Sequence, residues 1–151
     1  GDPDTIRAAV DAVLGVYRKR GFTVAQVIEA EVLPGTAESV SLHLFGNPDG
    51  TAETLLSYNA ATSELVLDRR RSGNTDFHAK FPSVESAPLV LEDGMLKLQI
   101  VVDHCSVEVF AQGGKVVLTD LVFPDDRHVE NRLTVKGGRA TIRTLTVASH
   151  S

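Results

Sequence analysis

Residues 26–32 read Gln-Val-Ile-Glu-Ala-Glu-Val, and from Ile28 onward apolar and acidic side chains alternate. The alternation places Ile28, Ala30 and Val32 on one face of an extended chain and both glutamates on the other. A period of two is typical of a β-strand with one face in a core and the other in water. Pro34-Gly35 follows as a stop signal, so we expect a strand that ends there.

The same pattern recurs along the rest of the chain. Ser39 to Phe45 alternates again, and Thr54 to Tyr58 leads through a polar turn into Glu64 to Arg71 as a hairpin. Further strands are expected at residues 96–103, 106–110, 115–123, 132–135 and 140–147, with turn signals such as Gly137-Gly138 between them. Residues 72–94 hold two prolines and are expected to be irregular. Many short strands predict an all-β fold, a two-sheet antiparallel β-sandwich of the jelly-roll or concanavalin-like kind.

The first twenty residues show a different period. The apolar residues that recur at helical spacing are Ile6, Val10, Val13, Leu14 and Tyr17. Asp2 or Asp4 can cap the start of a helix, and Gly21 suits its end. The pattern predicts one N-terminal amphipathic α-helix from about residue 4 to residue 19. Its apolar stripe must be buried against the rest of the domain or against a neighbour, and the second arrangement would give a homo-oligomer.

The division expected from these patterns is a helix or linker at residues 1–21 and a sandwich domain at residues 22–151. A chain of 151 residues is long enough for one domain with its own core. Its start, Gly1-Asp2-Pro3-Asp4, has neither a Met nor the apolar segment of a signal peptide. We therefore expect a piece of a longer protein, whose extracellular or cytoplasmic location depends on that parent protein.

The composition argues against several classes of partner. The 20 acidic and 15 basic residues give a net charge of −5, whereas nucleic-acid binders usually carry a basic balance or a basic stripe. No stretch approaches the ~20 apolar residues of a membrane-spanning helix. The single cysteine, Cys105, and histidines without ligand spacing predict neither a disulfide nor a metal site. We expect no cofactor.

Two segments resemble the C-terminal module of glycoside hydrolase family 32, the group of invertases, inulinases and levanases. Residues 67–78, Leu-Asp-Arg-Arg-Arg-Ser-Gly-Asn-Thr-Asp-Phe-His, are similar to its D-R-x-R-S-G-x-x-x-F stretch. Residues 100–110, Ile-Val-Val-Asp-His-Cys-Ser-Val-Glu-Val-Phe, resemble its V-D-x-S-S-V-E-V-F. His104 and Cys105 depart from that pattern. The resemblance covers roughly residues 26–148.

In that family the catalytic carboxyl groups belong to a five-bladed propeller that precedes the sandwich. Retaining hydrolysis needs two carboxyl groups about 5 Å apart, and the family carries them in W-M-N-D-P-N-G and E-C motifs. This chain has no Trp, and its only cysteine follows His104 rather than a Glu. The resemblance therefore implies a domain with no catalytic residues of its own, whose partner is a catalytic propeller in the same parent chain.

The stretch from Asp68 to Asn74 carries a dense set of charges, and Arg69 and Arg71 continue the inward face of their strand. A guanidinium cannot stay buried unpaired, so these arginines must reach the rim or meet an acid. The acids considered for this are Asp76, Glu85 and Asp103. A structural ion-pair network is the favoured interpretation, and a fructose or fructan pocket is the other. The candidate sugar-binding residues are Arg69, Arg71, Asn74, Asp103 and Glu108.

Aromatic residues bear on the same question. Tyr17, Tyr58 and most of the six Phe are core candidates. Exposed indole rings are a common stacking surface for sugars, and this chain has no Trp. Any sugar site is therefore expected to rely on hydrogen bonds in a small pocket.

Three functions follow from these observations. The leading hypothesis is a non-catalytic C-terminal accessory domain of a fructan- or sucrose-hydrolysing glycosidase, which supports the catalytic propeller and should expose an apolar patch for that contact. The second hypothesis is a module that binds the chain ends of levan or inulin. The third is an unrelated lectin-like sandwich, which would make both similar segments coincidental.

Overall fold

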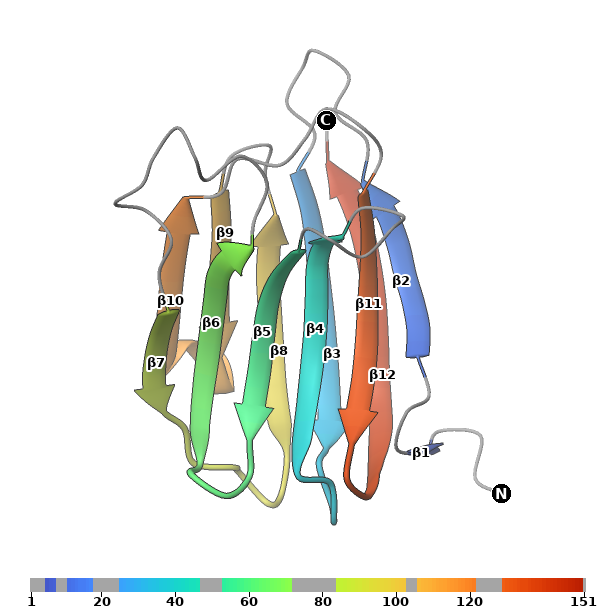
Figure 1. The fold of residues 1–151 in the computed structure, drawn as a ribbon, viewed down its shortest axis with the longest axis vertical. Helices are drawn as coiled ribbons and strands as arrows, with labels where there is room; N and C mark the ends of the chain where they lie inside the picture. Colours follow the sequence, from blue (N-terminus) through green and yellow to red (C-terminus); the bar gives the residue numbers. More distant parts are fainter. Residues whose placement is uncertain are drawn as a thin grey trace.

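The computed structural model describes residues 5–7, 11–17, 25–46, 53–71, 84–102, 106–121 and 129–150. Within these residues the chain forms two six-stranded antiparallel sheets that lie face to face (Figure 1). The prediction of an all-β, two-sheet antiparallel sandwich is confirmed.

Each sheet mixes strands from the two halves of the chain. Sheet A has the order β1 (Thr5–Arg7), β12 (Arg139–His150), β3 (Ala25–Leu33), β8 (Leu96–Val102), β9 (Ser106–Ala111), β10 (Val116–Leu121). Sheet B has the order β2 (Asp11–Tyr17), β11 (Val129–Lys136), β4 (Ser39–Gly46), β5 (Glu53–Asn59), β6 (Glu64–Arg71), β7 (Val84–Pro88). A short 3-10 turn, η2 (Gln112–Gly114), joins β9 to β10. The chain therefore crosses from one sheet to the other several times, and neither sheet is built from one continuous part of the sequence.

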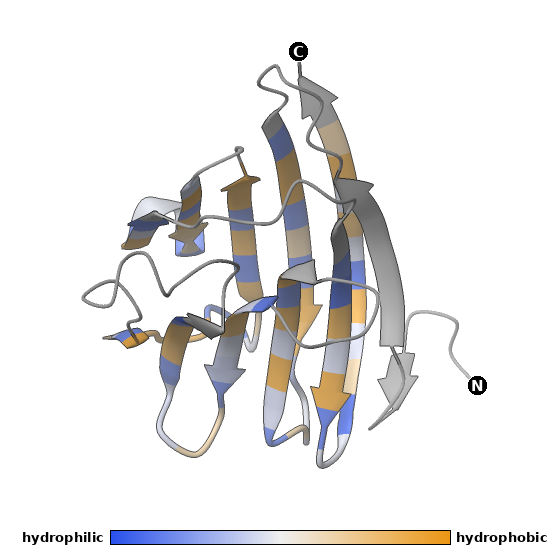
Figure 2. Ribbon diagram, turned by 45° about the horizontal axis from the view of Figure 1, so that its top comes forward, coloured by the Kyte–Doolittle hydropathy of each residue, from blue (hydrophilic) through white to orange (hydrophobic). Residues whose placement is uncertain are grey.

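The core lies between the sheets, where the inward residues of both meet. Along β8 and β9 every second side chain is buried, and Figure 2 shows the alternation as orange and blue bands along the strands. The largest fully buried side chains are Ile28, Leu42, Leu44, Leu56, Leu65, Leu67, Leu89, Leu96, Ile100, Leu133, Val32 and Val102. Burying each such side chain contributes about 1.5–3 kcal/mol, so this layer is the main source of stability.

The predicted helix at residues 4–19 is wrong. The described part of that segment forms β1 and β2, and no described residue lies in an α-helix. β2 pairs with β11 in sheet B. The β-branched Val13 and Val16 favour a strand over a helix, and pairing with β2 satisfies backbone groups that an open edge of β11 would leave without partners. The homo-oligomer was expected to form through this helix, so that ground for it is lost.

No helix among the described residues is long and apolar enough to cross a membrane. The described part of the chain contains one short helical turn, η2, and it closes a hairpin between two strands of sheet A.

Strand β7 lies inside the stretch that was expected to be irregular. It forms one edge of sheet B and pairs with β6. Its last residue is Pro88, and an edge strand tolerates proline because one side of its backbone needs no ladder partner. Pro88, which argued against a strand in the sequence, is therefore compatible with the place of β7 at the edge of the sheet.

The hairpin between β11 and β12 turns at Gly137 and Gly138, as the sequence predicts. Gly137 has a φ of 77°, a backbone conformation that side chains disfavour. A Cβ atom on Gly138 would lie 2.4 Å from the carbonyl oxygen of Thr36. Close approach of two backbone segments therefore requires glycine at this turn.

Substitutions on neighbouring residues of β6 test which face of the strand is inside. Leu65 is fully buried, whereas the side chain of Val66 is half-buried on the opposite face. We expect Leu65→Ala to lower the free energy of unfolding by about 2–5 kcal/mol and Val66→Ala to lower it by less than about 1 kcal/mol. Urea denaturation of both variants measures this. Equal losses would contradict the assigned orientation.

Candidate functional site

Buried polar side chains gather at one end of the sandwich, drawn at the top in Figure 1. Sheet A contributes an inward row that runs from Gln26 through Val102 and Val107 to Asp120. The buried polar residues of sheet B at this end are Thr54, Arg69 and Asn131. Neighbouring strands run in opposite directions, so the start of one strand and the end of the next lie at the same end of the sheet. Residues far apart in the sequence therefore share one layer. We call this layer the polar end of the core.

Two polar contacts join the sheets at the polar end. Arg69 Nε donates to Asp120 Oδ1 at 3.0 Å, and the two side chains are 11% and 5% exposed. Toward the other edge, Asn131 Nδ2 donates to Gln26 Oε1 at 3.1 Å. Each of these bonds joins a residue of sheet A to a residue of sheet B and can form only when the sheets are correctly aligned. The two contacts therefore favour one alignment of the sheets.

Thr54 lies between these two contacts along sheet B. Its side chain is fully buried, and its Oγ1 atom has no hydrogen-bond partner among the described residues. An unsatisfied buried hydroxyl costs stability. The polar end therefore contains at least one polar group that the described residues do not satisfy.

The structure places the sequence-predicted sugar-binding residues as follows. Arg69 points into the sandwich and is engaged with Asp120. Glu108 is half-buried on the outer face of β9. Arg71 ends β6, but its side chain lies outside the described residues, as do Asn74 and Asp103. Arg69 and Glu108 therefore face different spaces, one between the sheets and the other outside sheet A.

The partner of Arg69 is a feature that sequence reasoning missed. The expectation that this arginine would meet an acid is correct, but Asp120 was not among the acids considered. Asp120 follows an apolar run in β10 and faces inward. A carboxylate at an inward position of a strand was the signal available, because such a group needs a cationic partner.

A second polar network lies on the outer face of sheet B. His43 Nδ1 is 2.8 Å from Glu53 Oε2, and His43 Nε2 is 2.8 Å from Thr134 Oγ1. Ser41 and Ser57 are joined by a 2.9 Å contact between their hydroxyl oxygens. The order Glu-His-Thr has the connectivity of a nucleophilic triad, but it lies across three paired strands of an outer sheet face. Its evident role is to link β4, β5 and β11.

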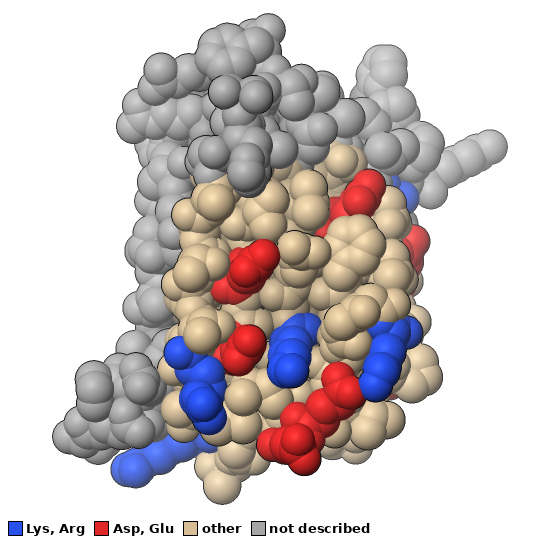
Figure 3. All heavy atoms as spheres, turned by 180° about the vertical axis from the view of Figure 1, so that it is seen from behind, with Lys and Arg blue, Asp and Glu red and all other residues tan. Residues whose placement is uncertain are grey.

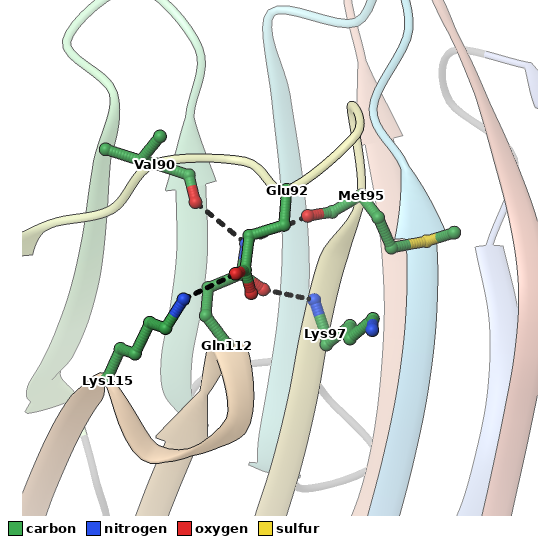
Figure 4. Close-up of polar contacts among 6 residues, drawn as sticks. All are labelled: Val90, Glu92, Met95, Lys97, Gln112 and Lys115. Atoms are coloured by element: carbon green, nitrogen blue, oxygen red, sulfur yellow. Dashed lines mark hydrogen bonds and ion pairs between the residues drawn. The ribbon is translucent and has the colours of Figure 1, made fainter.

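Gln112 organises the opposite end of the sandwich from the polar end (Figure 4). Its Oε1 accepts from the backbone N–H of Lys97 at 2.8 Å. Its Nε2 donates to the carbonyl oxygens of Val90 and Met95 at 2.8 and 2.9 Å. One buried amide thus holds the segment before β8 against the turn between β9 and β10.

An exposed ion pair lies beside this amide. Lys115 Nζ is 2.6 Å from Glu92 Oε2, and the lysine holds the pKa of the Glu92 carboxyl below its ordinary value. Surface pairs of this kind contribute little stability, so Gln112 is the main polar anchor at this end.

The outer face of sheet A carries a shallow groove of about 230 Å³. Figure 3 shows this face, where acidic and basic side chains are interspersed. The side chains that line the groove come from four strands: Glu29, Glu31, Lys97, Gln99, Phe110 and Thr144. Gly113 and Gly114 of the turn held by Gln112 form one border. The groove therefore depends on the turn as well as on the sheet.

Phe110 is not part of the core. It is half-buried on the outer face of β9 and lines the groove, whereas Tyr58 is buried with 4% exposure as expected. In the part of the chain that the structure describes, no three His, Cys, Asp or Glu side chains are grouped so as to hold a metal ion.

Curated relatives share substantial identity with this chain. A levanase from Bacillus sp. (strain L7) is 38% identical over 124 residues, which are 82% of this chain and 14% of the levanase. An extracellular exo-inulinase from Aspergillus ficuum is 39% identical over 103 residues, which are 68% of this chain and 19% of the inulinase. The chain thus spans less than a fifth of either relative.

Solved structures share the fold. The crystal structure of an exo-inulinase from Aspergillus awamori aligns with a TM-score of 0.74 and 31% identity, covering 97% of this chain and 28% of that one. The carbohydrate binding module CBM66 from Bacillus subtilis aligns with a TM-score of 0.59 and 11% identity, covering 95% of this chain and 80% of the module. At that identity the second match shows a common sandwich fold.

The pair at the polar end makes a specific prediction about stability. Asp120→Ala leaves the buried guanidinium of Arg69 without this partner, so we expect a loss of about 3–5 kcal/mol in the free energy of unfolding. The double variant Arg69→Met with Asp120→Ala should lose less, because no buried charge is left uncompensated. Urea denaturation of both variants tests this, and a larger loss in the double variant would contradict it.

The family assignment joins the fold to the comparisons. The family model described as "Glycosyl hydrolases family 32 C terminal" matches residues 8–149. The match includes all ten strands from β2 to β11, most of β12, and both segments whose sequence resembles that module. This chain therefore belongs to the C-terminal β-sandwich family of the family 32 glycosyl hydrolases.

Proposed function

We propose that this chain is the non-catalytic accessory domain of a fructan- or sucrose-hydrolysing enzyme and that it stabilises a catalytic domain in the same polypeptide. One observation carries the proposal: the chain matches a C-terminal family model over residues 8–149, yet it spans only 14% of a levanase relative. The relatives named levanase and exo-inulinase support fructans as the substrates of the parent enzyme.

The packing of the sandwich supports this role. The core is closed between the two sheets, so the domain can present a preformed surface to its neighbour. The exposed large apolar side chains of the described residues are Val84, Val90 and Val117. Two of them lie on β7 and β10, edge strands of the two sheets on the same side of the sandwich (Figure 1). We propose that this side contacts the catalytic domain, since exposed apolar side chains favour such contacts.

A second candidate function is the binding of fructan. One protein that shares the fold is a carbohydrate binding module, which supports testing this function, and the aromatic ring in the groove of sheet A favours it. The residues singled out from the sequence, Arg69, Arg71, Asn74, Asp103 and Glu108, stay a prediction for this function. Single modules commonly bind sugars with about 4–8 kcal/mol of free energy. Calorimetry with levan, inulin and fructose tests the candidate, and no heat at millimolar sugar would remove it.

The supporting role is tested in the full-length parent enzyme. We expect removal of this domain to lower the melting temperature of the catalytic domain, and Val117→Asp to lower it in the same direction by placing a charge in the proposed contact. Ala148→Asp is the matched control, because residue 148 is exposed on β12, away from the β7 and β10 side. Differential scanning calorimetry measures all three proteins.

The isolated chain provides the second control for that experiment. Both aspartate variants should melt at the temperature of the unchanged isolated chain, because neither side chain is buried in it. A parent enzyme whose catalytic domain melts unchanged after removal of the domain would contradict the supporting role. Equal effects of the two substitutions in the parent would contradict the proposed side of contact.

A further inference from the structure

We propose that the groove on the outer face of sheet A is a binding site for one neutral saccharide unit, such as a fructosyl residue, with the ring of Phe110 as its apolar wall. The inference rests on the proposed carbohydrate-related function and goes beyond it by assigning a site. The site differs from the set of residues suggested by the sequence.

The orientation of Phe110 is the first observation. An aromatic ring on the outer face of a strand is not needed by the core, which is filled by Val107, Val109 and Ala111 of the same strand. Beside it, Gly113 and Gly114 carry no side chain, and a Cβ atom placed on either would have nothing within 4 Å. The space next to the ring is therefore open. Sugar C–H groups pack against an aromatic face because the face carries partial negative charge.

Polar groups around the ring are the second observation. Lys97 and Glu31 lie directly opposite each other on β8 and β3, yet within the described residues neither charged group has a hydrogen bond or ion pair. Figure 4 shows the Lys97 side chain pointing away from the Glu92–Lys115 pair. Gln99 Nε2 donates to Glu29 Oε1 at 3.2 Å, which fixes the next pair of side chains. The groove thus offers an unpaired donor and an unpaired acceptor.

This arrangement selects the class of ligand. A sugar hydroxyl donates and accepts at the same atom, so adjacent hydroxyls can satisfy an ammonium and a carboxylate together. Two carboxylates against one ammonium disfavour phosphates and other anions. The groove, at about 230 Å³, is smaller than the ~300–1,000 Å³ of sites for drug-sized ligands. One sugar ring matches this size.

The polar end of the core is a weaker candidate for the same ligand. Arg69, the one inward-facing candidate whose side chain is described, is bonded to Asp120 between the sheets. Binding sugar there would first have to break a buried ion pair. The groove requires no such rearrangement, because its side chains already lie on an open face.

Amide chemical-shift mapping on the 151-residue chain tests the site. Fructose and short levan and inulin oligosaccharides are titrated into labelled protein. We expect shifts that saturate and are centred on Lys97, Gln99, Phe110 and Gly113. Phe110→Ala should weaken binding about tenfold or more, which corresponds to about 1.4 kcal/mol. Lys97→Met should weaken it in the same direction by removing a donor.

Matched variants separate binding from folding. Val27→Ala removes an apolar side chain from the same sheet face outside the groove lining and should leave the affinity unchanged. If Phe110→Ala does not fold, Phe110→Leu keeps most of the volume but removes the ring, and it should still lose affinity. Full affinity in the folded leucine variant would overturn the proposed stacking.

Other outcomes overturn the site itself. Saturating shifts centred on Arg69, whose side chain lies between the sheets, would support fructan binding at another place and reject the groove. Tighter binding of spermidine than of any sugar would show that the two carboxylates select cations. An absence of sugar-dependent shifts in the groove would reject it, while the melting experiment on the parent enzyme still decides the supporting role separately.

Discussion

Burial of two apolar sheet faces against each other is the constraint on which the structure depends. Every strand of the described core has to turn alternate side chains inward, and the strands of each sheet come from both halves of the chain. Toward one end the inward layer becomes polar, and the pairing of Arg69 with Asp120 and of Asn131 with Gln26 then replaces apolar packing. Interdigitated apolar packing holds the sheets together. Two directional contacts between facing sheets add to it, because each forms only when the sheets are correctly aligned.

The outer faces of the two sheets differ in how their polar groups are used. On sheet B, His43, Glu53 and Thr134 bond to one another, which leaves their hydrogen-bonding capacity partly satisfied within the protein. On sheet A, Lys97 and Glu31 have no such partners among the residues that the structure describes, and they lie beside an aromatic ring. A face with uncommitted donors and acceptors is suited to a hydroxyl-rich ligand. We therefore propose that the outer face of sheet B serves stability and the outer face of sheet A serves recognition.

The sequence predicted much of the fold because the period of two is local. β3, β4, β8 and β9 each show it within one segment, and the same rule correctly turned Arg69 inward. The segment that forms β2 fits both a helical and a strand period, and only pairing with β11 decides between them. β7 is short and ends in proline, so its local signal is weak. The partnership of Arg69 with Asp120 and the lining of the groove join residues from distant segments, which local patterns do not encode. The phenylalanines were expected to lie mostly in the core because their rings are apolar, although the alternation along β9 places Phe110 outside.

The family match assigns the chain to the C-terminal family of the family 32 glycosyl hydrolases. We propose that the domain holds its shape and presents surfaces, while another part of the parent enzyme cleaves the sugar bond. The most direct test is to incubate the purified 151-residue protein with levan, inulin and sucrose while monitoring its folding by circular dichroism. The account predicts a cooperatively folded β protein that releases no fructose above the buffer blank. Release of fructose at an enzymatic rate, abolished when the protein is unfolded, would contradict it.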